Sequence, residues 1–524
     1  MEIHLCFIVL VILGTAEGNL FSTKHSSTFV GVNSYLRDHK AADPVPVCPY
    51  HPKPVPLPSP LPDNITKALN DVSETLEKIW SNSSVPGMVA AVSYRGEILW
   101  SKGYGVIDKK STTVPGSDTI FRVGSISKVF AVLTVFQLLE RGHIKSLDDP
   151  LSDYCPSFSM KSTFDTVVTL RQVMADMSGL PGNPPCYLNI FTKTLCPDDT
   201  HTILSRLKEQ YLTAPPWTRP SYSNLGYSLL ARCVLEKFDP QATYENYVEK
   251  NILEPLNMAS TGFDYTDSVK SRMATGYNTD GSEDPLLNLG WAAPAGQMYS
   301  TINDLMKFAR FFTSAGQDGK VLRSDFVREM MLPVFVDYDF FTGFGTPFEM
   351  LLEGTYLIRS KGGIVGGFSG YMTFIPELEL SYVVLLNGAN PPGLVVVYPY
   401  AVLLAPFVTV LADIRPKHPL PPNPEAYVGN YTDQLKAFEF VILLVDNQLA
   451  MGVVPSYIQY VFLSYHDELL FQLDLPDLYT CELYEIIGVN DQWLYFDKVD
   501  SKTGKSPGFT FPSLTGTDKI TRID

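Results

Sequence analysis

The feature that most constrains this chain is a serine followed three residues later by a lysine, at the start of a long apolar segment. Ser125 and Lys128 precede the segment Val129–Leu139, which is apolar on nearly every side and is therefore predicted to form a buried helix. If this helix begins at Ser125, Lys128 lies one turn further along on the same face. The lysine amine is then within reach of the serine hydroxyl.

This spacing suits nucleophilic catalysis. A serine hydroxyl is a poor nucleophile at neutral pH unless a neighbouring base takes its proton. Burial and nearby positive charge disfavour a charged lysine, so Lys128 can accept or relay that proton. The first-turn amides also point to where an oxyanion would form. The spacing alone is weak evidence, because Ser205 and Lys208 repeat it in a segment patterned like an ordinary amphipathic helix.

A tyrosine and an asparagine two residues apart form a second candidate element. Tyr222 supplies a phenol that can shuttle protons, and Asn224 supplies an amide that can orient a substrate or a lysine. The same pattern occurs at 187–189 and at 244–246. The first of these lies between two cysteines and the second among charged residues. Only Tyr222 sits in a loop that opens directly onto an apolar helix, predicted over 225–235.

The third element is a lysine followed by two glycines. Lys361, Gly362 and Gly363 precede the strand-like run Ser381–Leu386, and glycines within a strand often mark a close backbone approach. A literal Lys-Thr-Gly occurs at 502–504, but its neighbours are typical of a solvent-exposed turn. We therefore reject that lysine as a catalytic candidate.

Taken together, these elements resemble the serine β-lactamase and penicillin-binding protein superfamily. The resemblance is strongest to its β-lactamase-related branch, which holds class C β-lactamases, D-alanyl-D-alanine carboxypeptidases and esterases. It spans about residues 85–410 and keeps the family's order in further segments: Ser146–Leu151, Thr169–Val173, Ser178–Pro181, Glu254–Met258 and Pro294–Leu305. The implied fold class is α+β, with an antiparallel sheet flanked by helices.

The resemblance implies a role for each site residue. Ser125 would be the acylated nucleophile, Lys128 its proton partner and Tyr222 the general acid and base. The implied substrate-binding residues are Asn224, Lys361, Gly362 and Gly363, and the backbone amides of Ser125 and Ile364 would form the oxyanion hole. Removing one oxyanion donor typically costs ~3 kcal/mol of transition-state stabilisation.

Three positions depart from the family pattern. Asp176 replaces the usual histidine before Ser-Gly-Leu-Pro, Gln297 replaces a common glycine and Gly370 replaces a common serine. None is expected to touch the nucleophile. Each is expected to alter the shape of the pocket and therefore the choice of substrate.

The predicted activity is that of a serine hydrolase acting through an acyl-enzyme on the amide or ester carbonyl of a small molecule or peptide. The alternative is a binding protein that keeps the fold and the pocket without turnover. No cofactor or metal is expected, because the eight histidines are scattered and neither His-Glu-x-x-His nor Cys-x-x-Cys occurs. The net charge of −16 disfavours nucleic acid as a partner.

The N-terminus and the cysteines favour export. Residues 5–16 form a short apolar block followed by small residues, which predicts a signal peptide over 1–18, with a retained membrane anchor as the alternative. Beyond Cys6 six cysteines remain, an even number, and Cys186 with Cys196 is the easiest pair to join because the two flank a short loop. Glycosylation sequons at Asn64, Asn82 and Asn430 agree with a secreted glycoprotein.

Composition changes along the chain predict its domains. A proline-rich arm over 19–62 is followed by a catalytic domain over 63–415 and a β-rich domain over 420–524. The catalytic domain should open with a helix over 63–80 and a hairpin over 89–100. Residues 393–412 carry no charge and are long enough to span a bilayer, but Pro399 and Pro406 argue against an uninterrupted span, so a buried helix is preferred and no stable membrane span is expected. The sequence does not address the oligomeric state.

Overall fold

The computed structural model describes residue 49 and residues 51–239, 241, 243–316, 318–389, 393–414, 418–454, 461–467, 469–474 and 492–524. The predicted signal peptide, most of the proline-rich arm, and Cys48 and Cys481 lie outside the described residues. The chain forms two compact units. The larger unit comprises Lys53–Leu411, and the smaller unit includes Ala412–Asp524. Each unit is described by itself.

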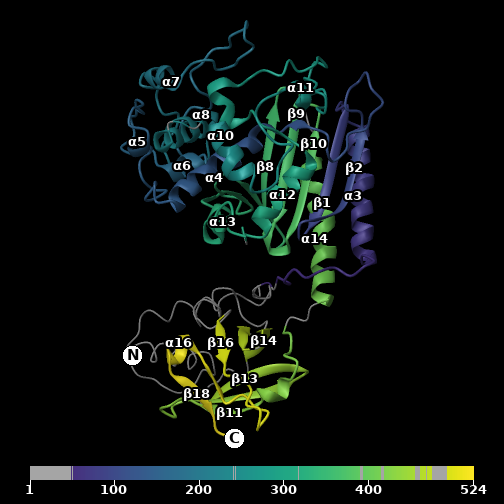
Figure 1. Cartoon of the computed structure of the whole chain (residues 1–524), viewed down its shortest axis with the longest axis vertical. Helices are drawn as coiled ribbons and strands as arrows, with labels where there is room; N and C mark the ends of the chain where they lie inside the picture. The colour runs from purple at the N-terminus through teal and green to yellow at the C-terminus, as the bar shows by residue number, and fades with distance from the viewer. Residues whose placement is uncertain are drawn as a thin grey trace, which may run out of the picture. The chain divides into compact units, whose positions relative to one another are not determined.

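An eight-stranded antiparallel sheet forms the centre of the larger unit (Figure 1). The N-terminal hairpin pairs with the returning strand, so that Ala90 lies opposite Val384, and this confirms the predicted mixed α+β class. The strands are, in spatial order, β2 (Glu97–Gly105), β1 (Gly87–Tyr94), β10 (Leu380–Leu386), β9 (Phe368–Ile375), β8 (Tyr356–Val365), β7 (Glu349–Glu353), β6 (Thr342–Phe344) and β5 (Phe335–Val336).

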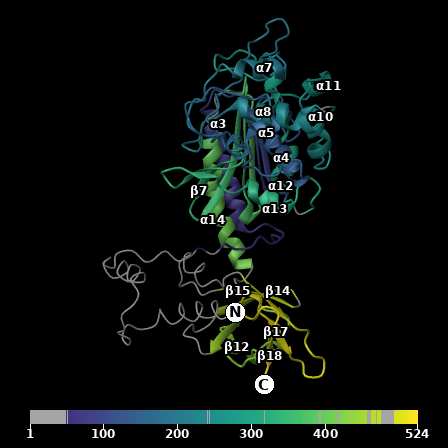
Figure 2. The ribbon, with the colours of Figure 1, turned by 90° about the vertical axis from the view of Figure 1, so that its left-hand side faces the viewer.

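Two long helices cover one face of this sheet, α3 (Asp63–Ser81) and α14 (Leu394–Ile414), as Figures 1 and 2 show. Helix α3 buries Ile65, Leu69, Val72 and Leu76, whose spacing makes one apolar face. Helix α14 buries Leu403 and Phe407 against the sheet and contains Pro399 and Pro406. Among the described residues, no helix combines the length and apolarity needed to cross a membrane.

The opposite face of the sheet packs on α4 (Ser127–Glu140) and α12 (Ile302–Thr313). Every residue of α4 from Ser127 to Leu138 is buried, which accounts for a segment that is apolar all round. Phe130 of α4 stacks on Phe308 of α12 with ring centroids 4.3 Å apart. The apolar segment predicted to form a buried helix therefore does so in the core of the unit, and the helix begins at Ser127 rather than at Ser125.

Shorter helices complete this side of the unit. They are α5 (Leu151–Tyr154), α6 (Leu170–Met174), α7 (Thr200–Leu207), α8 (Asn224–Leu229), the π-helix η2 (Leu230–Leu235), α9 (Glu236–Phe238), α10 (Tyr244–Val248), the π-helix η3 (Glu249–Leu253), α11 (Asp267–Lys270), the 3₁₀-helix η4 (Gly290–Ala295) and α13 (Ser324–Met330). Disulfides join Cys155 to Cys233 and Cys186 to Cys196, and the second is the pair favoured by the sequence.

The smaller unit contains a closed antiparallel barrel, in agreement with the β-rich composition of this segment. Phe440, Phe471 and Phe509 are fully buried in its core. The strands are β11 (Gly429–Thr432), β12 (Glu439–Val445), β13 (Gln448–Val454), β14 (Val461–Asp467), β15 (Leu470–Asp474), β16 (Trp493–Phe496), β17 (Gly508–Thr510) and β18 (Lys519–Arg522). The rejected Lys502 and its neighbours form an exposed turn here.

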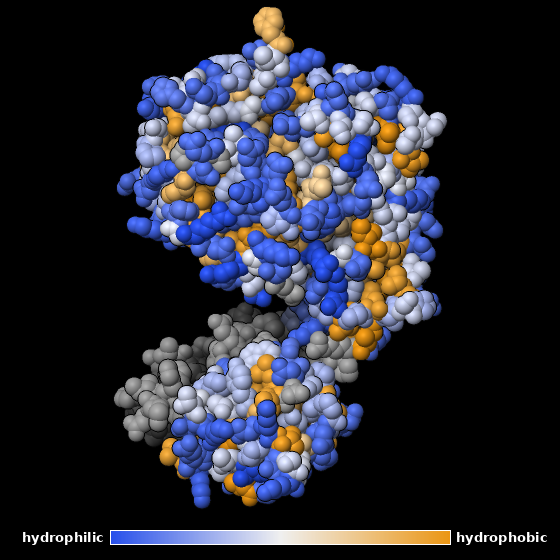
Figure 3. All heavy atoms as spheres, in the orientation of Figure 1, coloured by the Kyte–Doolittle hydropathy of each residue, from blue (hydrophilic) through white to orange (hydrophobic). Residues whose placement is uncertain are grey.

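Hydrophilic side chains cover most of the face drawn in Figure 3, with apolar ones gathered in smaller patches. One such patch follows α14, whose exposed side includes Ala401 and Ala405.

The feature that positions the candidate site is a close contact between β8 and the 3₁₀ turn η1 (Gly124–Ile126), which precedes α4. A Cβ on Gly363 would lie 2.1 Å from the carbonyl oxygen of Val123 and 2.6 Å from the amide nitrogen of Ser125. A Cβ on Gly124, whose φ is +51°, would lie 2.7 Å from the amide nitrogen of Ile364. Glycine is therefore required on both sides of the contact.

We expect Gly363→Ala to lower the free energy of unfolding of the larger unit by ~1–3 kcal/mol, because the new methyl group meets backbone atoms that cannot rotate away. Thermal denaturation followed by circular dichroism measures the change. Gly116→Ala is the matched control, since a Cβ there meets nothing within 4 Å. Equal midpoints for the two variants would contradict the contact.

Candidate active site

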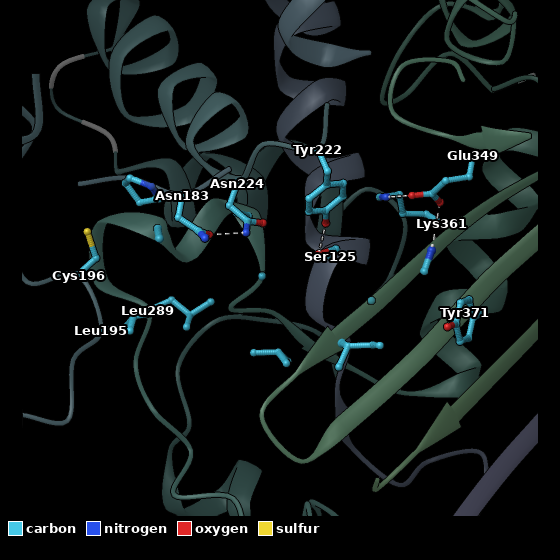
Figure 4. A pocket seen from close by; sticks show the side chains of 18 of the residues that line it. Ser125, Asn183, Leu195, Cys196, Tyr222, Asn224, Leu289, Glu349, Lys361 and Tyr371 are labelled. Atoms are coloured by element: carbon cyan, nitrogen blue, oxygen red, sulfur yellow. Dashed lines mark hydrogen bonds and ion pairs between the residues drawn. The ribbon is translucent and has the colours of Figure 1, made fainter. Parts of the chain in front are cut away.

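Ser125 lies in η1, between the short strand β3 (Phe121–Arg122) and α4, rather than inside the α-helix. The turn is fixed from within by Ser127, whose hydroxyl donates to the carbonyl oxygen of Gly124 at 2.7 Å and accepts from the amide of Met298 at 3.2 Å. Ser125 opens into a pocket of about 810 Å³ (Figure 4). The rigid turn holds its hydroxyl toward that pocket.

Lys128 is fully buried, and its amine has three partners. Nζ lies 2.9 Å from Oγ of Ser125, 2.7 Å from Oδ1 of Asn224 and 2.7 Å from the carbonyl oxygen of Ala295. The last two atoms can only accept hydrogen bonds. A neutral amine would therefore donate its two N–H groups to them and direct its lone pair toward the hydroxyl of Ser125. This is the geometry that a base for Ser125 requires.

The electrostatics favour that neutral amine. Burial, and then the positive charge of Lys361, hold the pKa of Lys128 well below the ordinary lysine value of 10.5, while Asp176 and Glu349 act in the opposite direction. Burial of a charged amine is costly unless it is paired, and no carboxylate is bonded to Nζ of Lys128 in the described residues.

Tyr222 also contacts Ser125. Its hydroxyl donates to Oγ of Ser125 at 2.5 Å, and Lys128 Nζ lies 4.6 Å from the centre of its ring. Desolvation at the phenol raises the pKa of Tyr222, and the charge of Lys361 offsets part of that rise. Tyr222 is therefore protonated at neutral pH and can deliver a proton.

Asn224 links the lysine to the rim of the pocket. Its Oδ1 accepts from Lys128, while its Nδ2 donates to Oδ1 of Asn183 at 2.8 Å. Both side chains line the pocket (Figure 4). The residue begins α8, whose cap is the Ser223 hydroxyl accepting from the amide of Gly226 at 3.1 Å, so the helix start fixes the orientation of the amide.

Lys361 lies in β8 and forms an ion pair with Glu349 of β7. The lysine side chain is 1% exposed, whereas that of Glu349 is 41% exposed and lines the pocket. Oε2 of Glu349 also accepts from the amide of Gly362 at 3.3 Å. Burial is the largest influence on the pKa of Lys361 and lowers it, but the charges of Glu349, Tyr222 and Asp176 and the hydrogen bond to Glu349 together outweigh it. The pKa therefore lies above the ordinary value and the lysine stays charged.

Asp176 lies behind the site. Its carboxylate accepts from the amide of Ser223 at 3.0 Å and from the hydroxyl of Tyr227 at 3.1 Å, and burial raises its pKa to about 6 despite the opposing charge of Lys361. It has no hydrogen bond to Ser125, as expected, but its effect extends beyond pocket shape because its charge also acts on Lys128.

The other two departures from the family pattern lie next to residues that line the pocket. The side chain of Gln297 accepts from the amide of Leu289 at 2.9 Å and donates to the carbonyl oxygen of Phe263 at 3.3 Å. Gly370 in β9 lies opposite Gly363 in β8. The first braces the loop next to η4, and the second lies in the strand beside the glycine contact.

The predicted oxyanion amides lie at the same corner, where β8 meets η1. The amide nitrogen of Ser125 would lie 2.6 Å from a Cβ added to Gly363, and that of Ile364 would lie 2.7 Å from a Cβ added to Gly124. Both amides therefore lie at the glycine contact. The structure thus brings together around one pocket all the residues that the sequence singled out: Ser125, Lys128, Tyr222, Asn224, Lys361, Gly362, Gly363 and Ile364.

The sequence analysis did not identify three groups of the site, and it recognised only part of the role of a fourth, Asp176. Glu349, Asn183 and the carbonyl oxygen of Ala295 had no recognisable motif, because their roles depend on strand pairing and on loop paths. Asp176 was noted as a departure, and its position beside Ser-Gly-Leu-Pro was the available signal. Within the described part of the chain, no group of three or more His, Cys, Asp and Glu could hold a metal ion.

The fold is that of β-lactamases and penicillin-binding proteins. The octameric penicillin-binding protein homologue from Pyrococcus abyssi superposes with a TM-score of 0.56 at 21% identity, covering 87% of this chain and all of that one. A class C β-lactamase from Rhodobacter sphaeroides superposes with a TM-score of 0.55 at 22% identity, covering 65% of this chain and 99% of that one.

Sequence comparison gives the family. The model of the beta-lactamase family matches residues 72–406. Beta-lactamase-like 1 of Homo sapiens is 32% identical over 508 residues, which cover 91% of this chain and 98% of the human protein. The chain belongs to the beta-lactamase family.

The charges around Lys128 predict a measurable pH dependence. The rate at which a fluorophosphonate labels Ser125 should rise with pH as Lys128 loses its proton, well below the ordinary lysine range. Asp176→Asn removes a negative charge that raises the pKa of Lys128, so its rising limb should lie at lower pH than that of the wild type. Labelling rates between about pH 5 and about pH 10 measure this shift.

Asp318→Asn removes an exposed acid outside this pocket and serves as the control. Its labelling rate should rise over the same pH range as that of the wild type. A rising limb of Asp176→Asn that moves to higher pH, or stays in place, would contradict the assigned interaction.

Proposed function

We propose that this chain is a serine hydrolase that cleaves an amide or ester carbonyl through an acyl-enzyme on Ser125. The observation that carries the proposal is that Lys128 Nζ and the Tyr222 hydroxyl both lie within hydrogen-bonding distance of Oγ of Ser125, at 2.9 Å and 2.5 Å. A serine needs a neighbouring base to attack a carbonyl, and a leaving group needs an acid. The two groups supply one each.

In the proposed acylation, the hydroxyl proton of Ser125 passes to Lys128 as Oγ bonds to the carbonyl carbon. The negative charge on the former carbonyl oxygen is stabilised by the amides of Ser125 and Ile364. The bond to the leaving group then breaks, and the leaving group takes the proton of Tyr222. The proton held by Lys128 restores the phenol.

Deacylation repeats these transfers with water in place of Ser125. Water gives a proton to Lys128 as its oxygen attacks the acyl carbon. Oγ of Ser125 then leaves with the proton of Tyr222, and the proton held by Lys128 restores the phenol. The substrate is a small molecule or a peptide that fits the pocket of about 810 Å³. Asn224, Gly362 and Gly363 line that pocket and would orient the acyl group.

The proposal predicts one adduct at one residue. Intact-mass measurement of the purified protein after exposure to a fluorophosphonate should show a single addition, mapped to the peptide that holds Ser125. Ser125→Ala should show none, and Lys128→Met should slow labelling by at least ~100-fold because the general base is lost.

Ser205→Ala is the matched control, since it removes the serine of the decoy pattern on the surface of α7 and should label like the wild type. A folded wild type that takes up no probe would favour the alternative of a binding protein without turnover.

We also propose that the protein is secreted as a glycoprotein. Asn64, Asn82 and Asn430 are all exposed, and the two disulfides are typical of an oxidising compartment. Expression in cultured animal cells should place the protein in the medium, with a mass that falls after treatment with a peptide N-glycosidase. Replacing all three asparagines by glutamine should remove the difference. Retention in the cell membrane would support the N-terminal anchor instead.

A further inference from the structure

The pocket has two chemically different ends on either side of Ser125 (Figure 4). One end is walled by the loop closed by the disulfide of Cys186, with Pro184, Leu195 and Leu289. The other end is walled by Glu349, Lys361 and Tyr371. Among the described residues that line the pocket, Glu349 and Lys361 are the charged ones.

The two charges of this pair are not equally accessible. The Lys361 side chain is enclosed at 1% exposure, and its ammonium lies 5.3 Å from the centre of the Tyr222 ring. The Glu349 side chain is 41% exposed. A molecule in the pocket therefore meets the carboxylate, while the lysine charge is already paired behind it.

Neighbouring groups do not reverse this balance. The amine of Lys128 favours its neutral form, and Asp176 adds a negative charge behind the site when it is ionised. The nearby cations Arg219 and Arg359 are committed to Asp337 and Glu377. The charge that is exposed at this end of the pocket is thus the carboxylate of Glu349.

We propose that Glu349 determines the charge of the substrate: this site takes acyl compounds whose group at the Glu349 end is positively charged, and it discriminates against a carboxylate there. The inference rests on the proposed function, because it names the substrate class of the same site. A substrate carboxylate at this end would meet Glu349 before it could reach Lys361, whereas an ammonium would replace solvent at the exposed oxygens.

Three fluorophosphonates with arms of the same length test this, ending in trimethylammonium, hydroxyl and carboxylate. The measurement is the second-order rate of labelling of Ser125. For the wild type we expect the cationic probe to react about tenfold faster than the anionic one, with the neutral probe between them, as expected for charges a few ångströms apart near the surface. Glu349→Gln should bring this ratio close to one.

Glu353→Gln is the matched control, because Glu353 lies in the same strand β7 but outside the pocket lining, and its ratio should equal that of the wild type. If Glu349→Gln does not fold, the wild type still decides. Its ratio should fall toward one as the salt concentration is raised from about 0.05 M to about 0.5 M, since a partly exposed carboxylate is screened.

Equal labelling of the wild type by all three probes, or faster labelling by the carboxylate probe, overturns the inference but leaves the proposed function in place. A ratio that survives in Glu349→Gln also overturns it, because another group would then be responsible. Failure of the neutral probe to label folded wild type contradicts the proposed function itself, and the inference falls with it.

Discussion

The site depends on one buried amine surrounded by oxygen atoms. Lys128 lies in helix α4, which is buried on every side. Its Nζ is within hydrogen-bonding distance of a side-chain amide oxygen, a backbone carbonyl oxygen and the serine hydroxyl. Because two of these partners can only accept, the amine satisfies them and still has a lone pair for Ser125. Helix α4, the first residue of α8 (Asn224) and the 3₁₀-helix that ends at Ala295 must all be in place for this to hold.

The glycine contact between β8 and η1 completes the arrangement from the other side. It brings the strand that carries Lys361 against the turn that carries Ser125 without any side chain between them. Ser125, the proposed nucleophile, is therefore placed by backbone packing, and its surroundings are set by side chains from β7, β8 and the loop before α8. The two lysines differ in charge for local reasons: Glu349 pairs with Lys361 and helps to keep it charged, whereas burial and then the charge of Lys361 favour loss of the proton of Lys128.

Much of this could be predicted from local sequence. The apolar segment after Lys128, the face formed by Ile65 and Leu69, and the glycines after Lys361 each predicted the element that the structure contains. Helix α4 begins at Ser127 rather than at Ser125, because the 3₁₀ turn η1 (Gly124–Ile126) comes first. Glu349 could not be found, since its partner is fixed by the pairing of β7 with β8 and no local pattern reveals strand register.

The order of strands in the sheet also has a consequence for how the chain acquires its structure. Strand β1 has β10 as its inner neighbour, and the amide of Gly87 donates to Asn387, 300 residues further along the chain. During synthesis the first hairpin therefore waits for almost the whole unit before its second edge is paired. Until then the apolar surface of α4 has no complete sheet to cover it, and such transient exposure favours aggregation of the incomplete chain.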